Sequence, residues 1–454
     1  MKSVNPATEE VIKSFEPHSD KEIEEIVKKS QEAHLKWKES TISERKVFNI
    51  KLKETLTKRK EEIAKLMTEE MGKPISQSYS EIDKCCWALE FYAEKADTFL
   101  SPQVVETESQ KSYVRFDPLG IVLAVMPWNF PFWQVFRFSA PSVVAGNSAL
   151  LKHASNVSMC SLAIEEIYAK SGFPENLFRS LLISGEKALD LLKNPLVKAA
   201  TLTGSEYAGI AVASEAGKNL KKVVLELGGS DPFIVLDDAE IEKAALWAAK
   251  ARTINNGQSC IAAKRFIIVE DVFAQFKEAF VEEMKKLKIG DPLDPLTDVG
   301  PIARKDLLEE VESQVQKSIS QGAKLLLGGK RIERKGYFYP PTILDNVTPD
   351  MTCFEEEIFA PVAPLIKAKN EEDAVFLANH TRFGLGASVW TRDLQKAEKI
   401  ASEIEAGTIF INGMVKSDPR LPFGGVKASG FGRELSYFGI REFVNIKSVS
   451  IEQT

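Results

Sequence analysis

The chain has 454 residues, of which 44% are hydrophobic and 27% charged, and a formal net charge of −6. This length exceeds that of one ordinary domain and the apolar content excludes a disordered chain, so we expect two or three globular domains. Positive and negative charges are interspersed without a basic stripe, which argues against a nucleic-acid partner.

Cysteine usage and the first residues favour a cytoplasmic protein. Cysteine occurs at five positions, an odd and sparse set for this length, which argues against a disulfide framework and for a reducing compartment. The N-terminal MKSVNPATEE lacks an apolar signal region, and no run approaches the roughly 18 apolar residues of a membrane span. We therefore expect no membrane partner.

The first hundred residues predict helices, and a parallel sheet follows them. SDKE (19–22) and TISE (41–44) are capping boxes in a helical region that extends to Gly72, and a third helix is predicted over 75–100. KSYVRF (111–116) alternates like a half-exposed strand, whereas GIVLAVMP (120–127) is continuously apolar, like a strand buried on both faces. Apolar runs and helical segments then alternate as in βαβ units.

A second series of the same kind begins after residues 226–230. Strand-like runs such as KRFIIVE (264–270) alternate with helices that are predicted over 273–287, 305–321, 371–380 and 394–405. Two α/β domains are therefore expected, with no linker rich in Pro and Ser between them. The last residues, FVNIKSVSIEQT, alternate as an exposed strand, which needs a partner in KSYVRF or in another subunit.

A glycine-containing turn is a candidate nucleotide site. The chain has neither a full G-x-G-x-x-G nor a P-loop. Instead, LTGSEYAG (202–209) ends a predicted strand at Thr203 and begins a helix with Gly204 and Ser205. Free amides at a helix N-terminus beside a glycine accept a diphosphate, and the alternative for this segment is an ordinary turn.

Cys260 lies in INNGQSCIAAKR (254–265), on a loop between a helix predicted over 241–255 and a strand. A thiol on such a loop can meet a ligand, whereas the alternative is a buried structural cysteine. We assign the other cysteines to packing, namely Cys85, Cys86, Cys160 and Cys353. The chain has four histidines and no HExxH or CxxC, so neither a zinc site nor a Ser-His triad is expected.

Two further polar residues end apolar strands. Glu226 stands in VVLELGG, and burial there would raise its pKa and suit it to act as a general base; the alternative is a solvated strand end. Asn129 stands in MPWNFP, where its amide is a donor on a stiff turn or simply a helix cap.

These motifs occur in one order along the chain. PWNFP, GSEYAG, ELGGSDP and GQSCIA are followed by EEEIFAPV and PFGGVKASGFGREL. In this order the chain resembles the aldehyde dehydrogenase superfamily over essentially its whole length. The segments PWNFPFWQVFR, LLKHASN and INGMVKSDPRLPFGGVK are most similar to the succinate-semialdehyde dehydrogenase branch.

The resemblance implies oxidation of an aldehyde, with succinate semialdehyde as the favoured substrate, to the acid with NAD or NADP. Cys260 would attack the aldehyde carbon, Asn129 and a backbone N–H would hold the oxyanion, and Glu226 would activate water to release the acid. The resemblance also implies a set of cofactor-binding residues: Trp128, Lys152, Ser155, Gly204, Ser205, Glu357 and Phe359.

Three departures from the family pattern bear on specificity. Ser155 stands where many NAD-preferring relatives carry a Glu that would repel a 2'-phosphate, so both cofactors remain open. Ala360 replaces a glycine in EIFAP, close to the expected nicotinamide. Arg137 matches one of two arginines that clamp a substrate carboxylate in some relatives, but Ile254 stands at the other position. Ser417 and Arg420, in the loop before PFGG, are the candidates that remain for binding this carboxylate, with Lys416 as an alternative.

The expected fold is an α/β, aldehyde dehydrogenase-like architecture in three parts. A Rossmann-type cofactor domain comprises 1–105 and 121–228, a catalytic domain comprises 229–430, and a small β oligomerisation element comprises 106–120 and 431–454. We expect a homodimer or homotetramer with a small-molecule aldehyde substrate. The alternatives are an enzyme for another short or medium aldehyde, a CoA-acylating relative, a thiol hydrolase, and a non-catalytic binding or structural protein on this scaffold.

Overall fold

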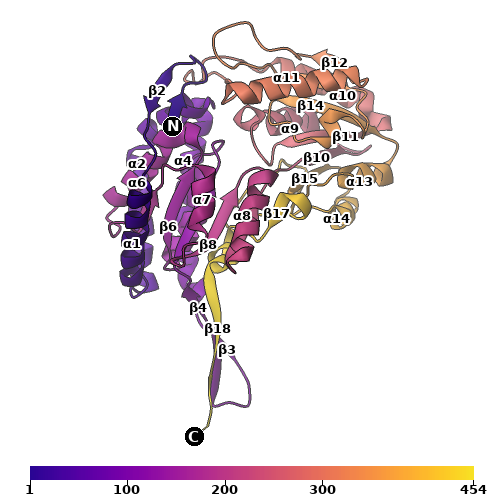
Figure 1. Ribbon diagram of the computed structural model, residues 1–454. Coiled ribbons are helices and arrows are strands. Elements are labelled where there is room, and N and C mark those ends of the chain that lie inside the picture. Colours follow the sequence, from indigo (N-terminus) through magenta and orange to yellow (C-terminus); the bar gives the residue numbers. More distant parts are fainter. Residues whose placement is uncertain (454) are drawn as a thin grey trace.

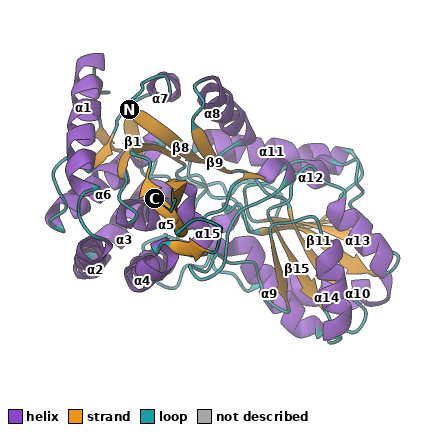
Figure 2. Ribbon diagram, turned by 90° about the horizontal axis from the view of Figure 1, so that it is seen from below, coloured by secondary structure: helices purple, strands orange, loops and turns teal. Residues whose placement is uncertain are grey.

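Two α/β lobes lie side by side, and a narrow three-stranded sheet extends away from them (Figure 1). Figure 1 shows a computed structural model that describes residues 1–453. The first lobe is drawn in indigo to magenta, and the second in magenta to orange. Both contain a mostly parallel sheet between layers of helices (Figure 2), which confirms the predicted α/β class.

Helices form most of the first hundred residues, as predicted. Both capping boxes are present: the hydroxyls of Ser19 and Thr41 accept from the backbone N–H groups of Glu22 and Glu44, whose carboxylates accept from the cap backbones. The four helices are α1 (Asp20–Trp37), α2 (Ile42–Lys58), α3 (Lys60–Met71) and α4 (Ile75–Leu100).

The sheet of the first lobe has six strands in the order β17-β9-β8-β5-β6-β7. Its members are β5 (Ile121–Met126), β6 (Ser148–His153), β7 (Phe178–Ser180), β8 (Val197–Thr203), β9 (Lys222–Glu226) and β17 (Gly430–Phe431). All pairs are parallel except β17 with β9. Because the chain passes from β5 to β6 on one side and later to β8 on the other, a crevice opens at the carboxyl ends of β5 and β8.

Both faces of this sheet are covered, which explains the continuously apolar strand. Val122 and Ala124 face a core shared with α2 to α6, whereas Ile121 and Leu123 face a core shared with α1, α7 and α8. All four side chains are fully buried. The helices added here are α5 (Trp133–Val144), α6 (Ser158–Lys170), α7 (Gly185–Leu191) and α8 (Glu206–Lys218).

The second lobe has a seven-stranded sheet in the order β12-β13-β14-β11-β10-β15-β16. Its strands are β10 (Asp231–Val235), β11 (Ala263–Val269), β12 (Lys324–Leu327), β13 (Thr342–Asp345), β14 (Val362–Ala368), β15 (Gly386–Trp390) and β16 (Thr408–Ile411). Helices α9 (Ile241–Thr253) and α10 (Glu270–Lys285) cover one face. The other face packs against α11 (Lys305–Ser320), α12 (Thr352–Glu355), α13 (Glu371–Asn379) and α14 (Leu394–Glu403).

The strand at the end of the chain pairs with KSYVRF, one of its two predicted partners. β18 (Val444–Ile451) runs antiparallel to β4 (Lys111–Pro118), and β3 (Gln103–Val105) pairs with the other edge of β4. Helix α15 (Ser436–Glu442) precedes β18, and near the N-terminus β1 (Lys2–Val4) pairs with β2 (Val11–Ser14).

Two local features differ from the sequence prediction. Helix α9 ends at Thr253, two residues before the predicted end, because Asn255 and Asn256 have left-handed backbones with φ of 55° and 58°. The short strands β1, β2, β3, β13 and β17 were not predicted. None of the helices in residues 1–453 combines the length and apolar character that a bilayer crossing needs.

Candidate active site

Cys260 lies on a short loop between η2 (Ile254–Gly257) and β11, and the backbone of η2 is unusual. Three successive residues, Asn255, Asn256 and Gly257, have positive φ angles of 55°, 58° and 75°. Asparagine tolerates this conformation, and at Gly257 a Cβ would also overlap the backbone of Ala360. Ala360, one of the departures from the family pattern, therefore packs against Gly257. Gly257 directly precedes the loop that carries Cys260 (258–262, the cysteine loop).

Side-chain hydrogen bonds hold this strained segment. Asn256 Nδ2 donates to the carbonyls of Gly72 and Pro301, at 2.9 Å each. Asn255 Nδ2 donates to the carbonyl of Asn129 at 2.8 Å. Both asparagines are fully buried, so these bonds form away from water and fix the loop against the first lobe.

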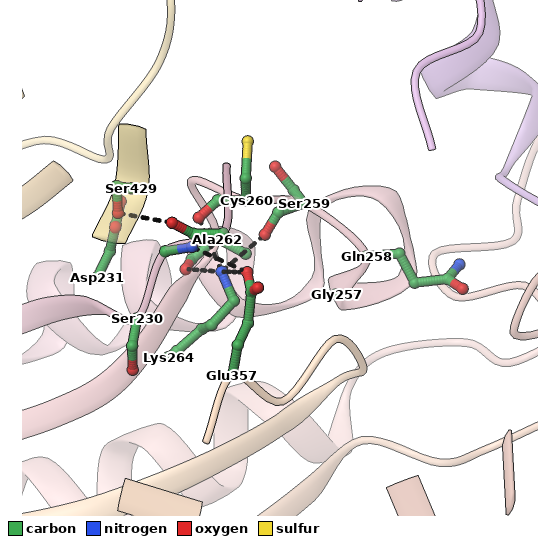
Figure 3. A network of polar contacts seen from close by, with 12 residues as sticks. Ser230, Asp231, Gly257, Gln258, Ser259, Cys260, Ala262, Lys264, Glu357 and Ser429 are labelled. Atoms are coloured by element: carbon green, nitrogen blue, oxygen red, sulfur yellow. Dashed lines mark hydrogen bonds and ion pairs between the residues drawn. The ribbon is translucent and has the colours of Figure 1, made fainter. Parts of the chain in front are cut away.

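A buried ammonium supports the loop from the opposite side. Lys264 Nζ donates to the carbonyls of Ser259 and Cys260, at 2.8 Å each, and forms an ion pair with Glu357 Oε1 at 3.2 Å. Figure 3 shows that the thiol of Cys260 points away from this network. The carbonyls are thus held on one side while Sγ projects to the other.

The thiol of Cys260 differs from the other four in its accessibility. Cys260 is partly exposed, whereas the other cysteines are buried, as predicted for packing residues. Burial by the surrounding protein raises the pKa of Cys260 to about 11, and the positive charges of Arg137 and Lys264 act in the opposite direction. Formation of the thiolate therefore depends on these cations.

Two pockets meet at Cys260. The strand-end pocket, of about 240 Å³, is lined by residues that follow β5 and β8 and by residues of α11. The α4 pocket, of about 500 Å³, is lined by α4, α5 and the segment 414–417. Cys260 and Gln134 line both pockets, so a group that enters from either side can reach the thiol.

The strand-end pocket brings together five of the predicted cofactor-binding residues: Trp128, Gly204, Ser205, Glu357 and Phe359. Ser205 caps α8, and its hydroxyl accepts from Ala208 N, which leaves its hydrogen free to donate. The rings of Trp128 and Phe359 are 5.8 Å apart at 86°. A helix N-terminus and two aromatic rings set edge to face in one pocket fit the diphosphate and the nicotinamide ring of a dinucleotide.

Lys152 and Ser155 do not line this pocket but lie at the neighbouring strand end. Lys152 belongs to β6, opposite Val125 of β5, and burial lowers its pKa. Ser155 is exposed and begins a short 3-10 turn, η1 (Ser155–Val157). Both positions are therefore at the same edge of the sheet as Trp128, one strand further out.

Asn129 is held in a fixed orientation beside the cysteine loop. Its Nδ2 donates to the carbonyl of Gln258 at 3.0 Å, and its Oδ1 accepts from Gln134 Nε2 at 2.9 Å. The side chain is 3% exposed and lines the strand-end pocket together with Cys260. An amide nitrogen has two hydrogens, so one remains available for a developing oxyanion next to the thiol.

Glu226 ends β9 and is buried, and neither carboxylate oxygen has a hydrogen-bond partner within the described chain. Burial raises the pKa of this carboxyl well above its usual value, opposed first by the charge of Arg137. Arg137 forms an ion pair with Glu434, and its NH2 group donates to Thr203 Oγ1 at 3.1 Å. A carboxyl with a raised pKa is suited to accept a proton near neutral pH.

The predicted carboxylate-binding residues do not all line the α4 pocket. Arg137 and Ser417 line the α4 pocket, as does Ile254, the apolar residue at the position of the missing arginine. Arg420 does not line it: its side chain is 66% exposed and is paired with Asp418 at 2.7 Å. Arg137 is 2% exposed, in the buried pair with Glu434.

Sequence reasoning missed several residues of this site. Gln134, Lys264 and Glu434 orient or neutralise predicted residues, and Lys84 of α4 projects to the α4 pocket. Glu434 stands in GFGREL, a segment that the resemblance covered without assigning a role to this residue. Lys84 stands in an ordinary amphipathic helix, where a lysine carries no signal of its function.

Comparisons with known proteins agree with this geometry. Residues 1–449 match the aldehyde dehydrogenase family. The chain is 48% identical over 449 residues to a probable succinate-semialdehyde dehydrogenase (NADP+) of Synechocystis sp., with 99% of both chains covered. It is 47% identical over 452 residues, again 99% of both chains, to the succinate-semialdehyde dehydrogenase (NADP+) of Mycobacterium leprae.

Solved structures show the same fold. The succinic semialdehyde dehydrogenase of Streptococcus pyogenes, determined in complex with NADP+, superposes with a TM-score of 0.98 at 36% identity over 100% of both chains. This agreement confirms the expected aldehyde dehydrogenase-like fold. The chain belongs to the aldehyde dehydrogenase family.

Proposed function

We propose that the protein oxidises succinate semialdehyde to succinate, with NADP+ or NAD+ as the hydride acceptor. The observation that carries this proposal is the position of Cys260, whose partly exposed thiol lies where the strand-end pocket meets the α4 pocket. One pocket fits a dinucleotide and the other leaves space for an aldehyde. The names of the relatives from Synechocystis sp. and Mycobacterium leprae support the substrate and favour NADP+.

The first step is carried by Cys260 and Asn129. The Cys260 thiolate attacks the aldehyde carbon, and the carbonyl oxygen becomes an oxyanion that accepts from the Asn129 amide and a backbone N–H. Arg137 and Lys264 favour the thiolate by their charge. Oxidation of the resulting thiohemiacetal to a thioester uses the hydride acceptor that bound NAD(P)+ supplies.

The second step requires a base for water, and we assign it to Glu226. The carboxylate accepts a proton from water while the oxygen attacks the thioester carbon, which releases the acid and restores the Cys260 thiol. Both Glu226 oxygens are buried without hydrogen-bond partners within the described chain and Glu226 lines neither pocket, so each oxygen can accept from a water that enters beside it. The ion pair of Arg137 with Glu434 keeps a compensated charge beside this base.

The cofactor is held mainly by the strand-end pocket. Ser205 and the N-terminus of α8 receive the diphosphate, Glu357 receives the nicotinamide ribose, and Lys152 receives the adenosine ribose. Trp128 and Phe359 flank the nicotinamide. Ser155, exposed beside Lys152, carries no charge that would repel a 2'-phosphate, which supports acceptance of NADP+.

The assembly is a homodimer or homotetramer formed through the three-stranded sheet, to which the predicted oligomerisation element, 106–120 and 431–454, contributes β4 and β18. Support comes from its position outside both lobes (Figure 1) and from exposed apolar side chains on it: Val104 is 73% exposed and Ile446 60% exposed. Edge strands of this kind pair with another chain. The molar mass in solution, measured by light scattering, tests this proposal.

The enzymatic proposal is tested by the absorbance of reduced nicotinamide with succinate semialdehyde and with butanal, each with both cofactors. We expect cofactor reduction with both aldehydes, and with succinate semialdehyde an amount of succinate equal to the reduced cofactor formed. A requirement for coenzyme A would assign thioester cleavage to that thiol instead of water. Absence of reduction with every aldehyde would contradict the proposal.

A further inference from the structure

Four cationic side chains line the α4 pocket: Lys84, Arg137, Lys250 and Lys416. They differ in whether solvent or a carboxylate already stabilises their charge. Lys250 and Lys416 are exposed to solvent. Arg137 is buried, but its guanidinium is paired with Glu434 and lies against the ring of Phe423, 4.7 Å from the centroid. Its charge is therefore compensated inside the protein.

Lys84 is the one of these four cations that is shielded from solvent and has no counter-ion among the described residues. Throughout residues 1–453 it forms no ion pair, and its hydrogen bond runs from Nζ to Ser417 Oγ, at 2.6 Å. Glu81, one helical turn earlier and also in the pocket lining, is already paired with the buried Lys73 and accepts from the backbone N–H groups of Phe132 and Trp133. A partly buried ammonium without a counter-ion attracts an anion.

We propose that Lys84, together with Ser417, binds the distal carboxylate of the semialdehyde and so determines the preference for an anionic substrate. This inference rests on the proposed function. Cys260 lines the same pocket, so a substrate anchored at Lys84 presents its aldehyde end to the thiol. The proposal assigns to Lys84 the role that sequence reasoning gave to Arg137.

The surroundings of Lys84 suit an anchor. The ring of Trp133 lies 4.7 Å from Nζ and holds the ammonium by a cation–π contact. One of the three N–H donors is used by Ser417, which leaves two for a carboxylate. The Ser417 hydroxyl accepts from Lys84, and its own hydrogen can be donated to the second carboxylate oxygen.

The protonation of Lys84 gives the proposal a second readout. Burial, and then the positive charge of Arg137, lower the pKa of Lys84 to about 8. Lys84 is therefore charged below about pH 8 and neutral above it. The kcat/KM value depends on the protonation of groups in the free enzyme, so it reports this change. The ratio of kcat/KM for succinate semialdehyde to that for butanal should therefore fall as the pH rises through 8. Titration of Cys260 affects both substrates and cancels in this ratio.

The test compares Lys84→Met with Lys250→Met, a matched change at an exposed lysine of the same pocket. A charge-assisted hydrogen bond corresponds to a change of about 10- to 100-fold in kcat/KM. We expect Lys84→Met to lower the ratio of succinate semialdehyde to butanal by this factor, mainly through KM, and to remove its pH dependence. Lys84→Arg, which keeps the charge, should recover part of the ratio, and Lys250→Met should leave it unchanged.

Two outcomes would overturn the inference. An unchanged ratio in Lys84→Met would show that another group binds the carboxylate, and an equal loss on both substrates would assign Lys84 to the structure of α4. Failure of the proposed function has a different signature, because the parent enzyme would then not oxidise succinate semialdehyde at all. Thermal denaturation of each variant checks that it is folded.

Discussion

The two pockets that meet at Cys260 are built from different parts of the structure. The strand-end pocket is built from residues at the carboxyl ends of β5 and β8, whose positions follow from the parallel sheet. The α4 pocket is built from side chains of α4, α5 and a loop of the second lobe. The first is fixed by backbone geometry, whereas the second is defined by side chains that can be exchanged without changing the fold.

This difference separates the chemistry from the choice of substrate. Asn129 and the cysteine loop are held by buried hydrogen bonds between the lobes, so changes there disturb every substrate alike. Lys84 of the α4 pocket stands on a helix face, and we propose that it contacts the substrate at its far end. Changes on this side should alter the ratio between substrates more than the common rate.

The largest effect is expected at the thiol that both pockets share. Cys260→Ala should abolish aldehyde oxidation with every substrate, because no other group forms the covalent intermediate. The dissociation constant of NADP+, measured by fluorescence, should stay close to that of the parent. Oxidation at a rate near that of the parent would remove Cys260 from this role.

Glu226→Gln sharpens the comparison by separating the two chemical steps. A general base contributes about 10²- to 10⁴-fold, so steady turnover should fall by this factor while the initial burst of reduced cofactor remains. Because burial raises the pKa of Glu226, the parent's deacylation should become faster as the pH rises and the carboxylate forms. Stopped-flow absorbance over a pH series measures both effects. A steady rate equal to that of the parent would assign the base to another group.

Arg137→Met tests whether this residue belongs to the chemistry or to substrate choice. Removing one partner of a buried ion pair leaves Glu434 uncompensated, so the free energy of unfolding should fall by about 3 to 5 kcal/mol. Activity with succinate semialdehyde and with butanal should fall in equal proportion. Urea denaturation and the two rates are the measurements. A selective loss with succinate semialdehyde would instead support the carboxylate contact that the sequence predicted.

The smallest effect is expected at Ser155, outside the strand-end pocket at the neighbouring strand end. Ser155→Glu places a carboxylate where the 2'-phosphate of NADP+ is expected, and repulsion between exposed like charges should lower kcat/KM for NADP+ by about tenfold. The value for NAD+ should change little. Ser155→Gln, of similar size and without charge, is the control. The same loss in both variants would indicate steric hindrance.

The same contrast explains how much of the site could be predicted from the sequence. Glu226 ends β9, Ser205 caps α8 and Asn129 lies in the short turn between β5 and α5, so a short motif carries both their position and their chemistry. Capping boxes at Ser19 and Thr41 were predictable for the same reason, because all their partners lie within three residues. The roles assigned to these site residues stay predictions until the variants are measured.

The α4 pocket could not be predicted in this way. Lys84 and Ser417 are more than 300 residues apart, and only the packing of α4 against the second lobe brings them within 2.6 Å. The pairing of Arg137 with Glu434 is almost as distant in sequence. A pattern in one segment cannot indicate whether a cation there is free or already neutralised by another segment.

The late position of β18 has a consequence for biosynthesis. β4 is complete at Pro118, but its antiparallel partner begins at Val444. At about 5 to 20 residues per second, the ribosome needs roughly a quarter of a minute to a minute to produce that partner. During this time one edge of β4 has no partner and is protected by the charges of Lys111 and Arg115, because β3 pairs only with the other edge. A nascent chain that terminates after Phe423 but before Val444 contains every residue that lines the two pockets, yet it keeps this edge permanently unpaired, so such premature termination should yield aggregates.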